Sequence, residues 1–238
     1  MKLIIDIGNT LFKLALFDGK NLAKESSFSR LDINIVASFV NGIEINHAIL
    51  SSVRLITDDI LNVIKCYNIL VLDSNINFPI KIKYKNIDSL GKDRLAAVVG
   101  AYFLYPQRNI LILDIGTCLT IDFINKEKEY IGGRISPGIN MRYAALHHFT
   151  EKLPLCQKVD SQYFIGNDTA SSIQSGVQQG IISELDVVID SFKQENKDII
   201  VIATGGDCFF FEKALKNTIF ADQFLVMRGL NDILDYNV

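Results

Sequence analysis

Residues 3–13 (LIIDIGNTLFK) and residues 111–121 (LILDIGTCLTI) decide the fold of this chain. In each stretch an apolar segment ends in Asp-Ile-Gly, a small polar residue follows, and a second apolar segment begins. Because glycine permits a tight turn, each copy predicts a β-hairpin whose first strand ends near an aspartate. The two aspartates, Asp6 and Asp114, are 114 − 6 = 108 residues apart, about the length of one domain. We infer a duplicated fold with two similar lobes.

Strand-like and helix-like segments alternate along the rest of the chain, which is typical of an α/β protein. Helices are expected at residues 33–39, 58–66, 92–104, 140–149, 169–192, 208–216 and 229–236. Further strands are expected at residues 11–18, 48–51, 69–72, 80–84, 120–124, 131–134, 199–203 and 223–226. Pro106 and its polar neighbours indicate the boundary between the lobes, which we place so that they span residues 1–108 and 109–238.

The composition fits a folded protein with a large core, since 49% of the 238 residues are hydrophobic and 21% are charged. The longest nearly apolar stretch, residues 95–105, is much shorter than the roughly 20 residues of a membrane span, so we expect a buried helix and no membrane association. The N-terminus lacks a signal-peptide pattern, which predicts a cytoplasmic protein. The net charge of −3 gives no basic footprint for nucleic acid. Four widely spaced cysteines predict free buried thiols.

The two aspartate–glycine turns suit the binding of a nucleoside triphosphate. Backbone N–H groups of a glycine turn can point at phosphate oxygens, and a strand-end carboxylate can hold magnesium directly or through water. One copy alone would favour an ordinary strand turn, whereas two copies favour two loops that grip one nucleotide across a cleft. The chain has neither a P-loop nor a Rossmann glycine motif. The candidate residues are Asp6, Gly8, Asn9, Thr10 and Lys13 in the first copy, and Asp114, Gly116 and Thr117 in the second.

The segment Gly91-Lys92-Asp93-Arg94 precedes the predicted apolar helix and is the second candidate site. Phosphoryl transfer needs a residue that orients the attacking hydroxyl and accepts its proton, and Asp93 suits that role. A carboxylate at a helix start is equally typical of a cap. Arg94 suits a two-pronged hydrogen bond to a substrate carboxylate, and its alternative is an exposed salt bridge.

Three further segments are weaker signals. Residues 203–207 (ATGGD) follow a predicted strand and could approach a flat adenine ring, although an ordinary strand-to-helix turn is about equally expected. Residues 132–138 (GGRISPG) are rich in turn formers and could shape a cleft wall. Adjacent histidines on a helix point in different directions, so we interpret His147 and His148 as structural rather than as metal ligands.

Taken in order, these segments resemble the type III pantothenate kinase family. The matching stretches are DIGNTLFK at 6–13, GKDR at 91–94, DIGTCLTID at 114–122, GGRISPGINM at 132–141, KLP at 152–154, IGNDTASSIQSG at 165–176 and TGGD at 204–207. They cover nearly the whole chain, and the ordered set is far more specific than any one of them. The resemblance implies an α/β fold of two actin-like (ribonuclease H-like) lobes with a nucleotide cleft between them. It also implies ATP-dependent phosphorylation of pantothenate, the first step of coenzyme A biosynthesis.

The resemblance also implies roles for individual residues. It makes Asp93 the catalytic base and Asp114 the ligand of a monovalent cation (K⁺ or NH₄⁺). The strand-end position of Asp6 leads us to expect that it holds Mg²⁺, directly or through water. Homodimerisation is implied as well. The residues implied to bind ATP are Asp6, Ile7, Gly8, Asn9, Thr10, Leu11, Phe12, Lys13 and Thr117. Those implied to bind pantothenate are Tyr84, Gly91, Lys92, Asp93, Arg94 and Thr169.

Two positions depart from the family's pattern. Cys118 stands where alanine is common, and Asp168 looks like an extra residue before Thr169, which weakens the assignment of that threonine. Three other functions are compatible with an actin-like fold: a kinase for another small molecule, a filament-forming protein, and a regulatory protein without turnover. The presence of Asp6, Asp93 and Asp114 argues against the last of these.

Overall fold

The computed structural model describes residues 1–55, 57–160 and 163–238, without the side chains of Asp59, Ile64 and Cys66. The chain forms two compact units. The first comprises Met1–Pro106, Glu127–Ile131 and Phe224–Val238, and the second comprises Gln107–Lys126 and Gly132–Gln223. The main segment of the first unit thus ends close to the expected boundary at residue 108, but two later segments return to it.

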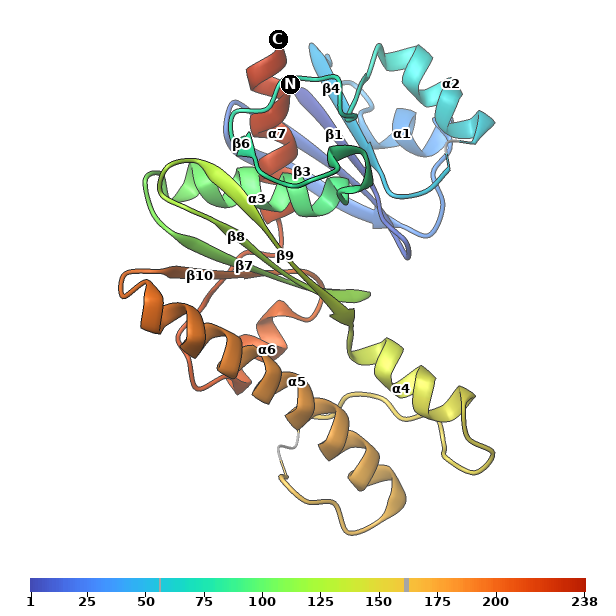
Figure 1. The fold of residues 1–238 in the computed structure, drawn as a ribbon. Coiled ribbons are helices and arrows are strands. Elements are labelled where there is room, and N and C mark those ends of the chain that lie inside the picture. Colours follow the sequence, from blue (N-terminus) through green and yellow to red (C-terminus); the bar gives the residue numbers. More distant parts are fainter. Residues whose placement is uncertain (56, 161–162) are drawn as a thin grey trace. The chain divides into compact units, whose positions relative to one another are not determined.

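The first unit is built on a five-stranded sheet in the order β3-β2-β1-β4-β5. Its strands are β1 (Lys2–Ile7), β2 (Phe12–Asp18), β3 (Asn21–Phe28), β4 (His47–Ser52) and β5 (Leu70–Val71). The three N-terminal strands are antiparallel, and β4 and β5 run parallel to β1. Helices α1 (Ile33–Phe39) and α2 (Asp58–Tyr67) cover one face, and α3 (Lys92–Leu104) and α7 (Leu225–Asn237) cover the other (Figure 1).

Strand β1 is buried on both faces, as its almost continuous apolar sequence predicts. Leu3, Ile5 and Ile7 belong to the hydrophobic core that also contains residues of α1 and α2. Since side chains alternate along a strand, Ile4 and Asp6 lie on the opposite face, the one that α7 contacts. The alternation therefore places the Asp6 carboxylate on the α3–α7 side of the sheet.

Helices α3 and α7 approach each other closely at two glycines. A Cβ atom added to Gly100 would lie 2.6 Å from Leu225 O, and one added to Gly229 would lie 1.8 Å from Ala96 O. Only glycine fits at these two positions without a shift of the backbone. This contact explains why the C-terminal segment belongs to the first unit. It also corrects the strand expected at residues 223–226, because helix α7 already begins at Leu225.

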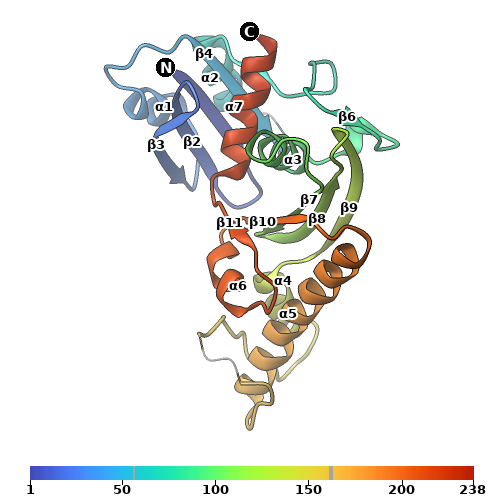
Figure 2. The same ribbon diagram turned by 90° about the vertical axis from the view of Figure 1, so that its left-hand side faces the viewer.

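The second sheet has six strands in the order β11-β10-β7-β8-β9-β6, and its first five strands repeat the topology of the first sheet (Figure 2). These five strands are β7 (Ile110–Ile115), β8 (Cys118–Ile124), β9 (Glu129–Pro137), β10 (Ile200–Thr204) and β11 (Phe220–Ala221). The helices are α4 (Ile139–His148), α5 (Thr169–Glu195) and α6 (Cys208–Ala214). β7 and β8 are antiparallel while β10 is parallel to β7, as in the first unit. The predicted duplication and the α/β class are confirmed.

The core of the second unit lies between its sheet and its helices. Leu111, Leu113 and Ile115 of β7 face this core, so alternation turns Asp114 to the opposite face, as for Asp6 in the first unit. The long helix α5 follows the predicted apolar spacing, with Ile173, Val177, Ile181, Leu185 and Val188 among its buried residues. Asp168 caps this helix.

The remaining elements are short. β6 (Lys81–Ile82) pairs with Glu129 and Tyr130 at the start of β9, and a 3₁₀ turn, η1 (Ile87–Ser89), precedes α3. Most expected elements are present within a few residues, and the expected buried helix corresponds to α3. β3 was not expected, because its sequence NLAKESSF is mostly polar. Among the described residues, no helix combines the length and apolarity that crossing a membrane requires.

Candidate active site

Asp6, at the end of β1, is the most unusual ionisable group of the first unit. It is only 6% exposed, and its neighbours in register are Lys13 on β2 and Ser51 on β4. Burial raises the pKa of Asp6 to about 6. The positive charge of Lys13 lowers this pKa, the negative charge of Asp93 raises it, and the Ser51 hydroxyl has the smallest effect, a lowering. Neither Asp6 Oδ1 nor Ser51 Oγ has a partner in hydrogen-bond geometry among the described residues. A buried carboxylate with an unused oxygen suits a cation or the water bound to it.

The turn after β1 consists of four residues, from Gly8 to Leu11. Gly8 N–H donates to Leu11 O at 3.0 Å and so closes the turn. This N–H is therefore not available to a phosphate, although the glycine turn was expected to point its N–H groups at phosphate oxygens. Asn9 and Thr10 at the tip are exposed. The side chains of Ile7 and Phe12 are buried, so they reach a nucleotide only through their backbone.

Arg54 is a cation at this turn that the sequence did not single out. Its guanidinium donates to Asn9 O and lies 5.3 Å from the centre of the Phe12 ring. It stands two residues beyond β4, whose last residue pairs in register with Ile7. The pairing of β4 with β1 is what brings Arg54 to the turn. Nothing in the local sequence around Arg54 indicates this position.

Asp93 is the second residue of α3, and its position is closely defined. Its Oδ1 accepts the N–H of Arg94 at 2.8 Å, one of the donors that a helix start leaves unpaired. A Cβ atom on Gly91 would lie 2.7 Å from the same oxygen, so the glycine leaves the space in which the carboxylate lies. The N-cap is Gly91, so Asp93 is not the cap that the sequence allowed, although it accepts one N–H of the first turn. This contact uses one carboxylate oxygen, and the role as proton acceptor stays a prediction.

Arg94 is buried, with 4% of its surface exposed, which rules out the exposed salt bridge that was its alternative. Its guanidinium carbon lies 5.8 Å from the centre of the Tyr84 ring. Tyr84 is partly exposed, and its ring stacks on that of Tyr130. The structure therefore brings Arg94 and Tyr84, two residues that the sequence linked to the substrate, into contact. Tyr130 was not expected there.

The second turn repeats the environment of the first. Asp114 is the next-to-last residue of β7, and its neighbours in register are Thr120 on β8 and Thr204 on β10. Thr204 is 1% exposed, and its Oγ1 has no hydrogen-bond partner among the described residues, like that of Ser51. The turn itself is shorter: Gly116 N–H donates to Cys118 O at 3.0 Å, and only Gly116 and Thr117 separate the strands.

Two glycine segments enclose the second turn at very short range. A Cβ atom on Gly205 would lie 2.5 Å from Asp114 Oδ1, and one on Gly138 would lie 2.2 Å from Gly116 O. Gly205 also has a positive φ of 90°, which favours glycine. The GGRISPG and TGGD stretches therefore shape the surroundings of Asp114. The adenine contact expected of the second stretch stays a prediction.

Asp207 ends the TGGD stretch and is held from two sides. Its N–H donates to Ile115 O at 3.0 Å, and its carboxylate forms an ion pair with Lys158. The Lys158 ammonium also lies 5.5 Å from the centre of the Phe210 ring. Since these residues are far apart in the sequence, local spacing gave no sign of Lys158.

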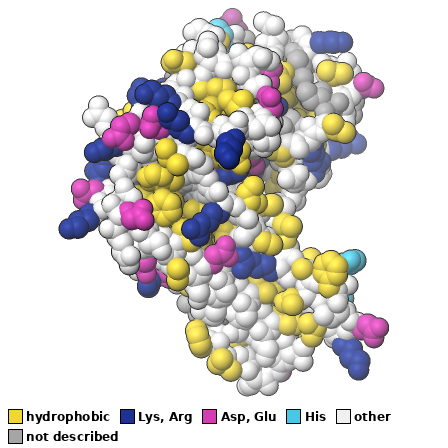
Figure 3. Space-filling model, in the orientation of Figure 1, with side chains coloured by type: hydrophobic (Ala, Val, Ile, Leu, Met, Phe, Trp, Pro, Cys, Tyr) yellow, Lys and Arg dark blue, Asp and Glu magenta, His cyan; other side chains and the backbone are white. Residues whose placement is uncertain are grey.

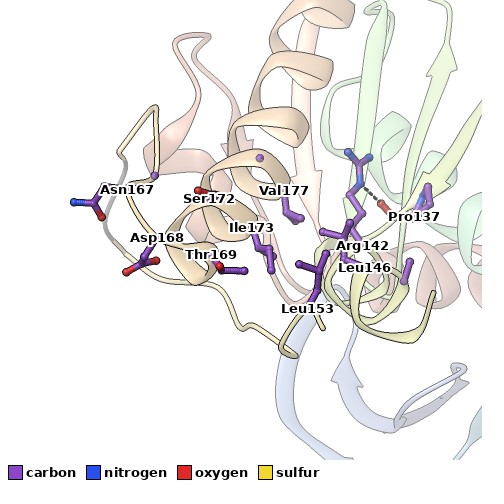
Figure 4. Close-up of a pocket in the computed structure, with 13 residues that line it drawn as sticks. Pro137, Arg142, Leu146, Leu153, Asn167, Asp168, Thr169, Ser172, Ile173 and Val177 are labelled. Atoms are coloured by element: carbon purple, nitrogen blue, oxygen red, sulfur yellow. Dashed lines mark hydrogen bonds between the residues drawn. The ribbon is translucent and has the colours of Figure 1, made fainter. Parts of the chain in front are cut away.

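Thr169 begins α5 and lines a cavity of about 1040 Å³ in the second unit. Figure 4 shows apolar side chains from α4 and α5 around it, including Leu146, Ile173 and Val177. Asp168, the residue that looked extra, caps the helix: its Oδ1 accepts the N–H of Ser171 at 2.7 Å, and these bonds lower the pKa of the carboxyl. The departure from the family pattern thus has a structural role.

His147 and Cys118 have local structural contacts. His147 Nδ1 lies 2.7 Å from Leu153 O, and Cys118 Sγ lies 4.0 Å from Met141 Sδ. Cys118, Cys156 and Cys208 are free thiols, and burial raises the pKa of Cys208 to about 11. Cys118 and Cys156 are partly exposed, which corrects the expectation that they are buried. Among the described residues, no three histidine, cysteine, aspartate or glutamate side chains group as a metal site would require.

Comparison with known sequences identifies the relatives of this chain. The family model for type III pantothenate kinase matches residues 2–191. A type III pantothenate kinase of Bacteroides fragilis (strain YCH46) is 40% identical over 239 residues, which cover 100% of this chain and 98% of the relative. That of Christiangramia forsetii is 40% identical and covers 100% of this chain and 99% of the relative. That of Cytophaga hutchinsonii is 41% identical and covers 100% of both chains.

Solved structures resemble the chain in fold. A Baf family protein from Campylobacter jejuni has a TM-score of 0.66 at 21% identity, covering 99% of this chain and 98% of its own. A 2-dehydro-3-deoxygalactonokinase protein from Sinorhizobium meliloti has a TM-score of 0.60 at 9% identity and covers 98% of both chains. For the polyphosphate/ATP-glucomannokinase of Arthrobacter sp. the TM-score is 0.51 at 12% identity, with both chains covered fully. The expected actin-like class is confirmed.

Proposed function

This chain belongs to the type III pantothenate kinase family, and we propose which of its residues carry the reaction of that family. The reaction is the ATP-dependent phosphorylation of pantothenate to 4′-phosphopantothenate, the first step of coenzyme A biosynthesis. The primary hydroxyl oxygen of pantothenate bonds to the γ-phosphorus, the bond to the bridging oxygen breaks, ADP leaves, and a base takes the hydroxyl proton. We place the reaction in the cytoplasm, where ATP is available.

We assign the role of base to Asp93. The observation that carries this proposal is the fixed position of its carboxylate at the start of α3, with Oδ1 held by Arg94 N–H beside Gly91. Oδ2 is then the oxygen that accepts the hydroxyl proton. Asp93 also lies near enough to Asp6 for its charge to raise the pKa of that group, which supports one shared site within the first unit. Such a base contributes about 10²–10⁴-fold to the rate.

The turn after β1 is proposed to bind the ATP phosphates. Its exposed tip and the flanking cations of Lys13 and Arg54 provide donors and positive charge. The proposed set is Asp6, Ile7, Gly8, Asn9, Thr10, Leu11, Phe12 and Lys13, together with Thr117 of the second unit, and Arg54 is added from the structure. Within this set Ile7 and Phe12 act through their backbone only, because their side chains are in the core.

Two cations are proposed to accompany ATP. Mg²⁺ offsets phosphate charge when it is bound, and the buried Asp6 carboxylate, with its unpartnered Oδ1, fits such an ion or its bound water. A monovalent cation, K⁺ or NH₄⁺, is assigned to Asp114. This strand-end carboxylate has Ile115 O in its surroundings, since a Cβ on Gly205 would lie 2.5 Å from both oxygens. Hard oxygen ligands of this kind suit either cation.

Pantothenate is proposed to bind against the start of α3. Arg94 would pair with its carboxylate, and Tyr84 would cover the guanidinium, as it already does in the structure. Gly91 and Lys92 complete the loop beside Asp93. Thr169 is proposed as a further substrate contact, which rests on its family position and on its place at the rim of a cavity.

A homodimer is proposed through the surface around α4 and α5. Phe149 is 82% exposed, Ile165 78% and Phe164 74%, and all three lie in the segments that flank these helices. Figure 3 shows hydrophobic side chains gathered over α4 beside the histidines. Apolar patches on this scale typically mark protein interfaces. Light scattering on a size-exclusion column measures the mass, and Phe149→Asp is expected to shift it toward the monomer.

Release of ADP tests the function directly. The chain is incubated with ATP and Mg²⁺, with and without pantothenate, in buffers with and without potassium. Release that requires pantothenate supports the proposal. Release that is stimulated only by a sugar or another alcohol in a substrate panel would contradict it and would point to another small-molecule kinase of the same fold.

A further inference from the structure

Tyr84 contacts both Arg94 and Tyr130, and we call these three side chains the stack. The ring centres of Tyr84 and Tyr130 are 6.2 Å apart and nearly parallel, at 4°, and the Arg94 guanidinium lies 5.8 Å from the Tyr84 ring. Tyr130 is 0% exposed, so it has no surface role of its own. Arg94 is 4% exposed, whereas Tyr84 in the middle is partly exposed. Tyr84 is therefore the accessible member of the three, and it joins two buried side chains.

The backbone fixes the same arrangement. β6 pairs with the start of β9, so that Ile82 is the Cα partner of Tyr130, and Lys83 N–H donates to Tyr130 O at 2.9 Å. Glu129 adds an ion pair with Lys83 at 3.3 Å. The strand before Tyr84, β6, is only two residues long. Glu129 and Tyr130 thus contact the segment before Tyr84 through its backbone and through Lys83, and Tyr130 also contacts the ring of Tyr84.

We propose that Tyr130 is a positioning residue that fixes the ring of Tyr84 and, through it, the guanidinium of Arg94, and so sets how strongly the enzyme prefers a carboxylate-bearing substrate. Stacked aromatic rings and a cation over a ring face are each favourable but directional contacts. Without the lower ring, Tyr84 turns to fill the space, and the planar guanidinium loses the surface that orients its fork. A two-pronged bond to a carboxylate requires that orientation, while contacts to a neutral group do not. This inference rests on the assignment of Arg94 to the substrate carboxylate.

Steady-state kinetics with two ligands test the proposal. Pantothenate is compared with an N-alkyl pantothenamide, in which a neutral amide replaces the carboxylate, used as a substrate or as a competitive inhibitor. Tyr130→Leu is expected to raise KM for pantothenate by about tenfold, the scale of one or two such ring contacts, with KM for ATP and binding of the amide changed by less than about twofold. Tyr130→Phe keeps the ring and is expected to restore the wild-type preference. Tyr102→Leu, which removes another buried tyrosine of the same unit, serves as the matched control.

Tyr84→Leu removes the shared member of the stack at a partly exposed position. By itself it is expected to reproduce the loss of carboxylate preference, and this single variant does not depend on folding of a core variant. With Tyr84 already changed, a second change at Tyr130 is expected to add no further loss of carboxylate preference, since the two act as a unit. Equal losses for pantothenate, the amide and ATP in Tyr130→Leu, or full additivity in the double variant, would overturn the positioning role. Arg94→Ala separates the role of Arg94 from the role of Tyr130. An unchanged KM for pantothenate in this variant would contradict the assignment of Arg94 to the substrate carboxylate, independently of the result for Tyr130.

Discussion

Gly91 lies directly against the carboxylate of Asp93. A Cβ atom at position 91 would be 2.7 Å from Asp93 Oδ1 and 3.4 Å from Arg94 Cδ, so the absence of a side chain at the helix start makes room for the proposed base. The same oxygen accepts the N–H of Arg94. The backbone before α3 and the carboxylate on its first turn thus form one geometric unit, from which two predictions follow.

Asp93→Asn removes the proton acceptor and keeps the shape of the side chain. We expect kcat to fall by about 10²–10⁴-fold while the dissociation constant for ATP changes by less than about threefold. Kinetics with pantothenate and calorimetric titration with an ATP analogue measure the two quantities. Asp88→Asn, an exposed change in η1 close to α3, is the control and is expected to leave both unchanged. Full turnover in Asp93→Asn would remove the assigned role.

Gly91→Ala is expected to displace the Asp93 carboxylate, because the new methyl group and Oδ1 cannot occupy the same space. A small misplacement of a reacting group is costly, and we expect kcat to fall by at least about tenfold. The melting temperature should change little, since the neighbouring atoms belong to the side chains of Asp93 and Arg94, which can move. Gly180→Ala on α5, where the nearest atom is 3.9 Å away, is the matched control without a kinetic effect. Unchanged kcat in Gly91→Ala would show that the carboxylate tolerates the shift.

The raised pKa of Asp6 predicts that the free energy of unfolding of the metal-free and nucleotide-free chain depends on pH. Its pKa is about 6 when folded and 3.8 ordinarily, so between these values the folded state holds a proton that the unfolded state has lost. Stability contributed by this group is therefore greatest at acid pH and falls as the pH rises through this window, by about 3 kcal/mol at most. Urea unfolding in a chelator at pH 4.5 and 7.5 measures it.

The variant Asp6→Asn isolates this contribution, since other groups also titrate in the same range. It is expected to reduce the difference in unfolding free energy between the two pH values, relative to the unchanged chain. Asp18→Asn, at the exposed end of β2, should retain the original difference. An identical pH profile for Asp6→Asn and the unchanged chain would contradict the raised pKa.

Gly229→Ala should destabilise the first unit by separating α3 from α7. Its methyl group would overlap the carbonyl oxygen of Ala96, and the obstacle is backbone that cannot rotate away. Overpacking of this kind costs about 1–3 kcal/mol or more, and urea unfolding measures the loss. Gly180→Ala again serves as the control. A variant as stable as the original chain would show that the helices separate at no cost.

Asp114→Asn tests the proposed monovalent cation. The amide keeps the size of the side chain and removes its charge, so we expect activity to fall and the stimulation by potassium to disappear. The rate of ADP release is compared in potassium and in tetramethylammonium salts of equal ionic strength. Asp198→Asn, an exposed change in the second unit, should keep the potassium response. A normal potassium response in Asp114→Asn would place the cation elsewhere.

Local sequence was sufficient wherever one segment specifies its own structure. The repeated Asp-Ile-Gly stretches predicted two hairpins, and the apolar run after Gly91 predicted α3 between its observed limits. The mostly polar β3 escaped prediction because it is an edge strand, held by pairing with β2 rather than by an apolar pattern of its own. The start of α7 was misread because residues 223–226 have a strand-like composition, whereas the helix that packs against α3 begins at Leu225.

The sequence by itself therefore determined the two-fold repeat and the family, and it predicted the roles that we propose for Asp6, Asp93 and Asp114. Only the tertiary structure decided that Arg54 reaches the first turn, that Ser51 and Thr204 stand beside the two aspartates, and that Tyr130 supports Tyr84. The physical reason is the range of the interactions. Turns and helix starts depend on neighbours along the chain, whereas burial, strand register and ring stacking depend on residues that only folding brings together.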